Sequence, residues 1–361
     1  MHAPQNAYIH IPFCNSKCFY CAFISTVNTK LELGYLIALL KEIDTNYQGN
    51  TLNTLYFGGG TPSILPLEHV KKIFNKFNLA PNAEITLELN PENATADYLS
   101  GLKEIGINRL SIGIQTFNDN ILKQIGRRHS AEQAQNAVKI AQNAGFDNIS
   151  LDFIYGLPNQ TIEEFTNDLE IAKTFNVPHI SLYGLKIEDN SVFGKKTPQN
   201  LPDDDLQADM YLKAIDVLKD FSHYEISNFA KTGFESRHNL NYWDNAQYYG
   251  FGCAAHGYEA GMRYANCFDI HKYLENPLIK DYGHFETEKE KLEEEIFLGF
   301  RRSSGINVNE INKKFNINFD EKYKETIQKY LKTGHLKQTQ AGYALSNEGF
   351  LISTVILAEF I

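Results

Sequence analysis

Over its first two hundred residues the chain alternates short β-branched apolar runs with longer amphipathic stretches. In the longer stretches apolar residues recur every three or four positions, as on a buried helix face, whereas the short runs are typical of buried strands. The predicted strands are Tyr8–Ile11, Thr54–Phe57, Ile85–Leu89, Arg109–Ile114, Ile149–Ile154 and His179–Leu185. The predicted helices are Leu31–Tyr47, Leu67–Phe77, Thr95–Ile105, Asp119–Ile125, Ala131–Ala144 and Ile162–Phe175. Strands regularly followed by helices indicate βα units around a parallel sheet. In the first helix, the pattern predicts an inward face of Leu33, Leu36, Ile37, Leu40 and Ile43.

The pattern changes after a further helix, which is capped by the aspartates at 203–205 and extends to Lys219. From Glu286 onward it predicts several helices, a short hairpin over Leu336–Leu345 and a final helix. Helices followed by a two-stranded wing suggest a winged-helix-like module. We therefore expect three regions, at residues 1–230, 231–285 and 286–361. The last region carries 11 Lys and Arg against 12 Asp and Glu, so it lacks the basic surface of a DNA-reading winged helix and is better suited to a structural or partner-docking role.

Composition narrows the class of protein. The chain has 361 residues and a net charge of −10, which gives no electrostatic footprint for nucleic acid. The longest apolar run, Phe350–Ile361, is interrupted by polar residues and is shorter than the roughly 20 residues that cross a bilayer. The first six residues are too short and too polar for a signal peptide. We therefore expect a cytoplasmic protein without a membrane span.

Three of the five cysteines lie close together, in the order Cys14, Cys18 and Cys21. A zinc site would need a second Cys or His pair downstream, and none is present in a suitable spacing. Thiolates in a short loop also suit an iron–sulfur cubane, where three protein ligands leave one iron open to a small molecule. The spacing could instead mark a helical stripe of core residues, but Pro12 and the polar residues at 15–17 argue against a helix here.

The C-x3-C-x2-C spacing, with Tyr20 before the third cysteine, resembles the radical S-adenosylmethionine (SAM) family. The longer string Tyr-Ile-His-Ile-Pro-Phe-Cys, beginning at Tyr8, is similar to oxygen-independent coproporphyrinogen III oxidase and its relatives. This resemblance implies an α/β fold with an incomplete (β/α)6 barrel. It also implies a 4Fe-4S cluster on Cys14, Cys18 and Cys21, and SAM bound through the fourth iron. Ligands of such barrels lie at the C-terminal ends of the strands.

Several predicted strands end in a polar residue or a glycine run. Gly58–Gly60 allows the backbone to approach a ligand closely, although a plain tight turn would explain it too. Glu88 lies among apolar neighbours, where an unpartnered carboxylate is costly. Arg127 belongs to a basic cluster that could simply be a solvated surface. By resemblance, the SAM-binding positions are Tyr8, Tyr20, Gly59, Gly60, Thr61, Glu88, Gln115, Arg127 and Asp152. The resemblance implies that Asp152 binds the ribose hydroxyls of SAM and that Arg127 binds its carboxylate.

A second motif, His-Asn-x-x-Tyr-Trp, contains the only tryptophan. It resembles the motif that marks the HemW branch, the radical SAM heme chaperones. Imidazole can ligate heme iron, and Tyr and Trp rings can stack on a porphyrin. The implied heme-binding residues are His238, Asn239, Tyr242 and Trp243, with His256 as a reserve ligand. From residue chemistry alone, the two aromatic rings could equally plug the barrel while His238 bonds the backbone.

Two functions remain, a heme chaperone that passes heme to an acceptor protein and an oxygen-independent coproporphyrinogen III oxidase. Phe23 stands where the oxidases carry a fourth cysteine, and only seven residues precede Tyr8, so the N-terminal extension of the oxidases is absent. Both features, with the His-Asn-x-x-Tyr-Trp motif, favour the chaperone. Ala22 departs from the aspartate usual in that branch. The resemblance implies heme, a heme acceptor and an electron donor as partners. It leaves open the acceptor, whether SAM is cleaved productively in an enzymatic reaction, and whether the chain dimerises.

Overall fold

In the computed structural model, which describes residues 3–361, the chain forms two compact units. The first contains the residues up to 217 together with 247–284, and the second contains 218–246 together with 285–361. The predicted connecting region, 231–285, is thus divided between the two units. Each unit is built from two separate stretches of chain.

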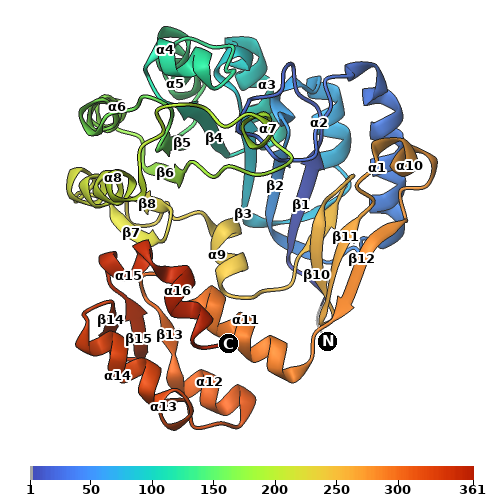
Figure 1. The fold of residues 1–361 in the computed structure, drawn as a ribbon. Helices are drawn as coiled ribbons and strands as arrows, with labels where there is room; N and C mark the ends of the chain where they lie inside the picture. Colours follow the sequence, from blue (N-terminus) through green and yellow to red (C-terminus); the bar gives the residue numbers. More distant parts are fainter. Residues whose placement is uncertain (1–2) are drawn as a thin grey trace. The chain divides into compact units, whose positions relative to one another are not determined.

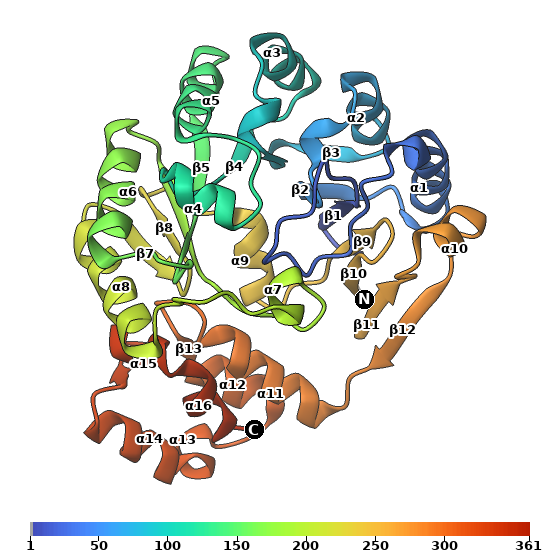
Figure 2. The same cartoon turned by 45° about the horizontal axis from the view of Figure 1, so that its top comes forward.

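The first unit is organised around a parallel sheet, whose strands run in the order β6-β5-β4-β3-β2-β1-β9. The strands curve into an open barrel, and the helices lie along its outer side (Figures 1 and 2). The strands are β1 Asn6–Ile11, β2 Thr51–Gly59, β3 Asn78–Leu89, β4 Arg109–Gln115, β5 Asn148–Tyr155, β6 His179–Gly184 and β9 Tyr249–Phe251. The six strands expected from the sequence are all present, which confirms the predicted incomplete α/β barrel. β9 was not predicted.

Helices follow the strands as the apolar pattern predicts, and several begin at a side-chain cap. Thr161 and Ser130, for example, open α6 and α5 with capping boxes, which satisfy the free N–H groups of the first turn. The helices of this unit are α1 Glu32–Asn46, α2 Leu67–Phe74, α3 Ala96–Ile105, α4 Asp119–Gln124, α5 Ala131–Asn143, α6 Ile162–Thr174, α7 Val192–Lys195, α8 Asp204–Val217 and α10 Ile270–Glu275. Three short 3-10 turns cover Thr29–Leu31, Pro62–Ile64 and Pro91–Asn93.

The predicted inward face of α1 is partly wrong. Leu36 and Ile43 are buried, but Leu33 and Ile37 are 59% and 63% exposed. The buried face runs instead through Tyr35 and Leu39. The helix has apolar residues on more than one side, so apolar spacing alone did not identify the side that faces the sheet.

A three-stranded sheet, in the order β10-β11-β12, follows β9. Its strands are β10 His256–Glu259, β11 Met262–Asn266 and β12 Lys280–Phe285. Glu42 of α1 is fully buried and ties this late part of the chain to the first helix. It accepts hydrogen bonds from the Gly252 amide at 2.8 Å, the Asn266 side-chain amide at 2.8 Å and the Tyr273 hydroxyl at 2.7 Å. A buried carboxylate with three donors is a well-satisfied acceptor.

The second unit combines helices with a small antiparallel sheet of order β13-β15-β14, as expected for a winged-helix-like module. The strands of this sheet are β13 Ile306–Asn307, β14 Leu336–Gln338 and β15 Gly342–Leu345. The unit also contains the strands β7 Ser222–Glu225 and β8 Asn228–Ala230. Its helices are α9 Arg237–Trp243, α11 Glu288–Gly299, α12 Val308–Phe315, α13 Phe319–Lys322, α14 Lys324–Lys332, α15 Asn347–Leu351 and α16 Ser353–Ala358. Across residues 3–361, no helix combines the length and apolar character that a membrane crossing requires.

Candidate functional site: a cavity lined by three cysteines

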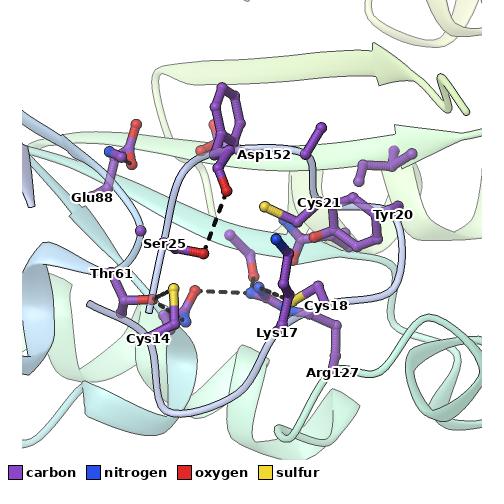
Figure 3. Close-up of a pocket in the computed structure, with 18 of the residues that line it drawn as sticks. Cys14, Lys17, Cys18, Tyr20, Cys21, Ser25, Thr61, Glu88, Arg127 and Asp152 are labelled. Carbon is purple, nitrogen blue, oxygen red and sulfur yellow. Dashed lines mark hydrogen bonds between the residues drawn. The ribbon is translucent and has the colours of Figure 1, made fainter. Parts of the chain in front are cut away.

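A cavity of about 590 Å³ lies within the first unit, at the end of the barrel where the parallel strands finish. The loop after β1 forms one wall and carries Cys14, Cys18 and Cys21 (Figure 3). The facing walls come from the ends of β2 to β6. The cavity is therefore in the place that the barrel fold predicts for a ligand.

The cysteine loop is held at both of its ends. The Cys14 amide donates to the Thr26 carbonyl at 3.0 Å, and the Thr26 amide donates to the Pro12 carbonyl at 2.7 Å. At the middle of the loop, the Phe19 amide donates to the Ile125 carbonyl at 3.0 Å, after α4. The loop is thus anchored by backbone bonds, which leaves the cysteine side chains available to the cavity.

His10 of β1 supports the same loop from beneath. Its Nε2 lies 3.0 Å from the Ile24 carbonyl, and its Nδ1 lies 3.1 Å from the Tyr8 hydroxyl. Burial lowers the pKa of His10 to about 4, so the ring is neutral near pH 7. Because a carbonyl only accepts, Nε2 carries the proton and Nδ1 accepts from Tyr8. His10 therefore fixes the return of the loop just after Cys21.

The glycines after β2 bring backbone against this loop. Gly59 has a φ of +111°, and a Cβ there would lie 2.5 Å from the His10 ring. A Cβ on Gly60 would lie 2.7 Å from the Phe13 carbonyl and 3.0 Å from the Cys14 sulfur. A side chain at either position would displace the cysteine loop. Thr61 follows, and its hydroxyl donates to the Cys14 sulfur at 3.5 Å.

Glu88 lies near the end of β3 with both carboxylate oxygens engaged. The Tyr56 hydroxyl donates to Oε1 at 2.9 Å, and the Gly59 amide donates to Oε2 at 3.1 Å. Burial, with the charge of Asp152 adding to it, raises the pKa of Glu88 to about 7. With this pKa, the carboxyl group of Glu88 is only partly ionised near pH 7. A hydrogen-bond donor or a cation placed beside it by a ligand would favour the ionised form.

Asp152 lies on β5, three residues before the strand ends at Tyr155. Hydroxyl groups fix both of its oxygens: Ser111 donates at 2.6 Å and Ser150 at 2.9 Å. Ser150 also lies 2.8 Å from Nδ1 of the buried His179. Asp152 thus belongs to a buried polar network beneath the cavity, and its orientation is set before any ligand binds.

Gln115 and Arg127 carry the features expected of unfilled ligand contacts. Gln115 ends β4 with a φ of +63°, an uncommon conformation for a residue with a side chain, and its buried Oε1 has no partner among the described residues. Arg127 lies after α4, and its Nη2 donates to the Asn90 side chain at 3.0 Å and to the Gly113 carbonyl at 2.6 Å. Its buried Nε has no partner among the residues described.

These observations fit a 4Fe-4S cluster and SAM. Three thiols border one cavity, a glycine run leaves room beside them, and Gln115 and Arg127 present unsatisfied polar atoms. Within residues 3–361, no group of three His, Cys, Asp or Glu is arranged to hold a single metal ion.

The structure brings together most of the residues predicted from the sequence. The lining of the cavity includes Cys14, Cys18, Tyr20, Cys21, Gly59, Gly60, Thr61, Glu88, Gln115, Arg127 and Asp152. Tyr8 is not in the lining and lies behind Glu88, with its hydroxyl on His10. Sequence reasoning missed Tyr56, Asn90 and Ser111. Strand alternation puts Ser111 on the same face as Gln115, which is a signal for a buried polar face but does not identify its partner Asp152.

The predicted heme motif lies in the second unit, on α9. His238 is only 1% exposed, and its Nε2 lies 2.8 Å from the Tyr242 hydroxyl, with the two rings edge to face. Trp243, at the end of the helix, lies near the buried Glu225, whose pKa burial raises to about 7, and the buried indole nitrogen of Trp243 has no hydrogen-bond partner among the described residues. The motif is therefore packed into its unit. His256 is exposed on β10.

Comparisons with known proteins agree with this geometry. Residues 8–172 match the model of the radical SAM superfamily, and residues 287–352 match the HemN C-terminal domain. The chain is 36% identical to a heme chaperone HemW from Lactococcus lactis, over 100% of this chain and 98% of that protein. It is 35% identical to a heme chaperone HemW from Bacillus subtilis, over 99% of both chains.

The fold is shared with a solved structure, coproporphyrinogen III oxidase (HemN) from Escherichia coli. That likeness has a TM-score of 0.86 and 23% identity, and it covers 99% of this chain and 90% of the oxidase. By its identity to full-length relatives and by its two matched domains, the chain belongs to the HemW family of radical SAM heme chaperones.

Proposed function

We propose that this protein binds heme, a 4Fe-4S cluster and SAM, and transfers heme to an acceptor protein. Cys14, Cys18 and Cys21 would hold the cluster, which supplies an open iron for the amino and carboxylate groups of SAM. The observation that carries the cofactor part is the single cavity in which these cysteines meet Glu88, Gln115 and Arg127. An electron donor, a cytoplasmic location and a dimer remain expectations from the family.

The residues of the cavity have complementary roles toward SAM. Glu88 and the glycine run would accept hydrogen bonds from its α-amino group, which is neutral when it ligates the iron, and the Arg127 guanidinium would hold its carboxylate. Asp152 would accept hydrogen bonds from ribose hydroxyls. Tyr20 lines the cavity beside the loop and would border the nucleoside. Each of these roles uses a side chain whose orientation is already fixed by neighbours, which favours binding by reducing the entropy lost.

The heme part rests on the motif of α9 and on the printed names of the relatives. His238 would ligate the iron, while Tyr242 and Trp243 would stack on the porphyrin, at about 0.5–1.5 kcal/mol per stacked pair. Because His238 is buried against Tyr242, ligation requires this contact to open. Asn239 lies on the same helix, and its amide donates to the Ser236 cap.

The decisive experiment compares His238→Ala with Tyr242→Phe in anaerobically reconstituted protein. If His238 ligates heme, His238→Ala weakens binding and shifts the Soret band, whereas Tyr242→Phe, which keeps the ring but frees the imidazole, does not. If the contact between His238 and Tyr242 has only a structural role, both variants lose heme binding to the same extent. His271→Ala removes an exposed imidazole and serves as the matched control.

The same preparation tests the alternative function. Wild-type protein with cluster, SAM and reductant is incubated with coproporphyrinogen III, and protoporphyrinogen is measured after oxidation to the porphyrin. We expect no conversion, because Phe23 replaces the additional cysteine of the oxidases. Conversion that depends on SAM would establish the oxidase and reject the chaperone as the sole function.

A further inference from the structure

The cysteines of the loop differ in their hydrogen-bond donors. Cys14 receives a neutral donor, because the Thr61 hydroxyl donates to its sulfur. Cys18 is different, because Nη1 of Arg127 lies 3.6 Å from its sulfur, within hydrogen-bond range for sulfur. Figure 3 shows the guanidinium beside Cys18. The surroundings of the three cysteines are therefore unequal, with the cationic guanidinium of Arg127 beside the sulfur of Cys18.

The Arg127 guanidinium is fixed in this position from its other side. Nη2 donates to both Asn90 and Gly113, and the Arg127 amide donates to the Leu122 carbonyl at 2.9 Å. A guanidinium is planar and remains charged at all accessible pH values. With Nη2 held at two acceptors, Nη1 is directed at Cys18, while the buried Nε has no partner among the described residues.

We propose that Arg127 raises the reduction potential of the cluster by donating from Nη1 to the Cys18 sulfur, in addition to any contact with SAM. Hydrogen bonds to cluster sulfurs and nearby positive charge set the potentials of iron–sulfur centres. Both favour the reduced state, because that state carries one more negative charge. This inference rests on the proposed cluster, but not on SAM or heme binding.

The test is a redox titration, monitored by electron paramagnetic resonance, of the full chain reconstituted without SAM. Dithionite supplies the electron. We expect Arg127→Gln to shift the midpoint to a more negative potential, because both the charge and the directed donor are lost. Arg128→Gln is the matched control: it removes the same charge one residue away, where the side chain is exposed and Nη1 contacts the Asn15 carbonyl at 3.4 Å. We expect it to leave the midpoint unchanged.

An unchanged midpoint potential in Arg127→Gln would overturn the proposal. An equal shift in Arg128→Gln would also overturn it, because the loss of positive charge near the cluster would then explain the shift without the directed donor. If Arg127→Gln loads too little iron to titrate, Arg127→Lys decides in its place. Lysine keeps the charge but is not a planar donor, so a smaller negative shift supports the proposal and a wild-type midpoint rejects it. Failure of the wild type to assemble any cluster would instead reject the proposed function.

Discussion

Glu88 shows how a single residue can make ligand binding depend on pH. Its pKa is raised to about 7 by burial, so the carboxyl is largely neutral at pH 6 and largely ionised at pH 7.5. Below pH 7 the site therefore lacks the negative charge that would accept a hydrogen bond from the amino group of SAM.

We predict that SAM binds more tightly to the reconstituted protein at pH 7.5 than at pH 6, by up to about tenfold, in line with the change in ionisation. In Glu88→Gln the affinity should fall by roughly 10- to 100-fold at pH 7.5, as for a lost charged hydrogen bond, and its pH dependence should flatten. Equilibrium dialysis with labelled SAM measures both.

Glu92→Gln is the control for this prediction. Glu92 lines the same cavity, but the effect of burial is outweighed by the His129 ring 3.7 Å away and by the Arg127 charge, which hold the pKa of Glu92 below its ordinary value. It stays ionised over the whole range, so this variant should keep the pH dependence. An affinity that is equal at both pH values in wild-type protein would contradict the assigned role of Glu88.

Much of the site was predictable from the sequence because cysteine spacing and strand-end polarity are local patterns. The residues that support these side chains were not predictable, since their contacts depend on strand register. The pairing of β4 with β5 sets Ser111 opposite Ser150, and this register brings the Ser111 hydroxyl within reach of Asp152. The role of His10 was missed for the same reason. Its partner Ile24 lies in a loop whose path no residue pattern specifies.

At the scale of elements, the apolar residues of α1 illustrate where periodicity fails. Leu33 and Ile37 match the helical spacing as well as Leu36 does, yet they are exposed. The sheet packs against the side that includes Leu39, which is fully buried. Strand and helix positions follow from local sequence, whereas the choice between two apolar sides depends on which one the tertiary fold covers.

We predict that Ile37→Ser changes the free energy of unfolding by no more than about 0.5 kcal/mol, as for exposed positions. Leu39→Ala on the same helix should cost about 2–5 kcal/mol, because it leaves a cavity in the core. Chemical denaturation followed by far-UV circular dichroism gives both values. A loss of more than 2 kcal/mol in Ile37→Ser would indicate that this side of α1 is covered in solution.

At the scale of the whole molecule, each unit is assembled from two stretches of chain. In the second unit, the Ile226 amide donates to the Arg301 carbonyl, and the Ser303 amide donates to the Tyr224 carbonyl. The segment 218–246, which carries α9 and the heme motif, is therefore completed by residues far downstream. The sequence pattern changes near Lys219 and Glu286, close to two of the points where the chain passes between units, but it does not mark the passage after residue 246 or show that 218–246 packs with 285–361.

We predict that truncation after His284 leaves residues 218–246 without these partners and makes the segment sensitive to protease. New tryptic cuts should appear after Lys231 and Arg237, identified by mass spectrometry, while the segment 6–217 resists as it does in the intact chain. A truncated protein as resistant as the full one over 218–246 would show that this segment folds without the C-terminal residues.

The pairing of β9 with β1 has a consequence for the time at which the cofactor site can form. β1 leads into the cysteine loop, yet its neighbour β9 begins only at Tyr249, and the donors for Glu42 lie later still. At about 5–20 residues per second, a ribosome needs roughly 10–50 s to pass from one strand to the other. During that interval one edge of β1 lacks its partner, and an unpaired edge can join a foreign strand. Cofactor loading is therefore expected to follow the release of residues near 270, after the interval in which the free edge of β1 needs protection.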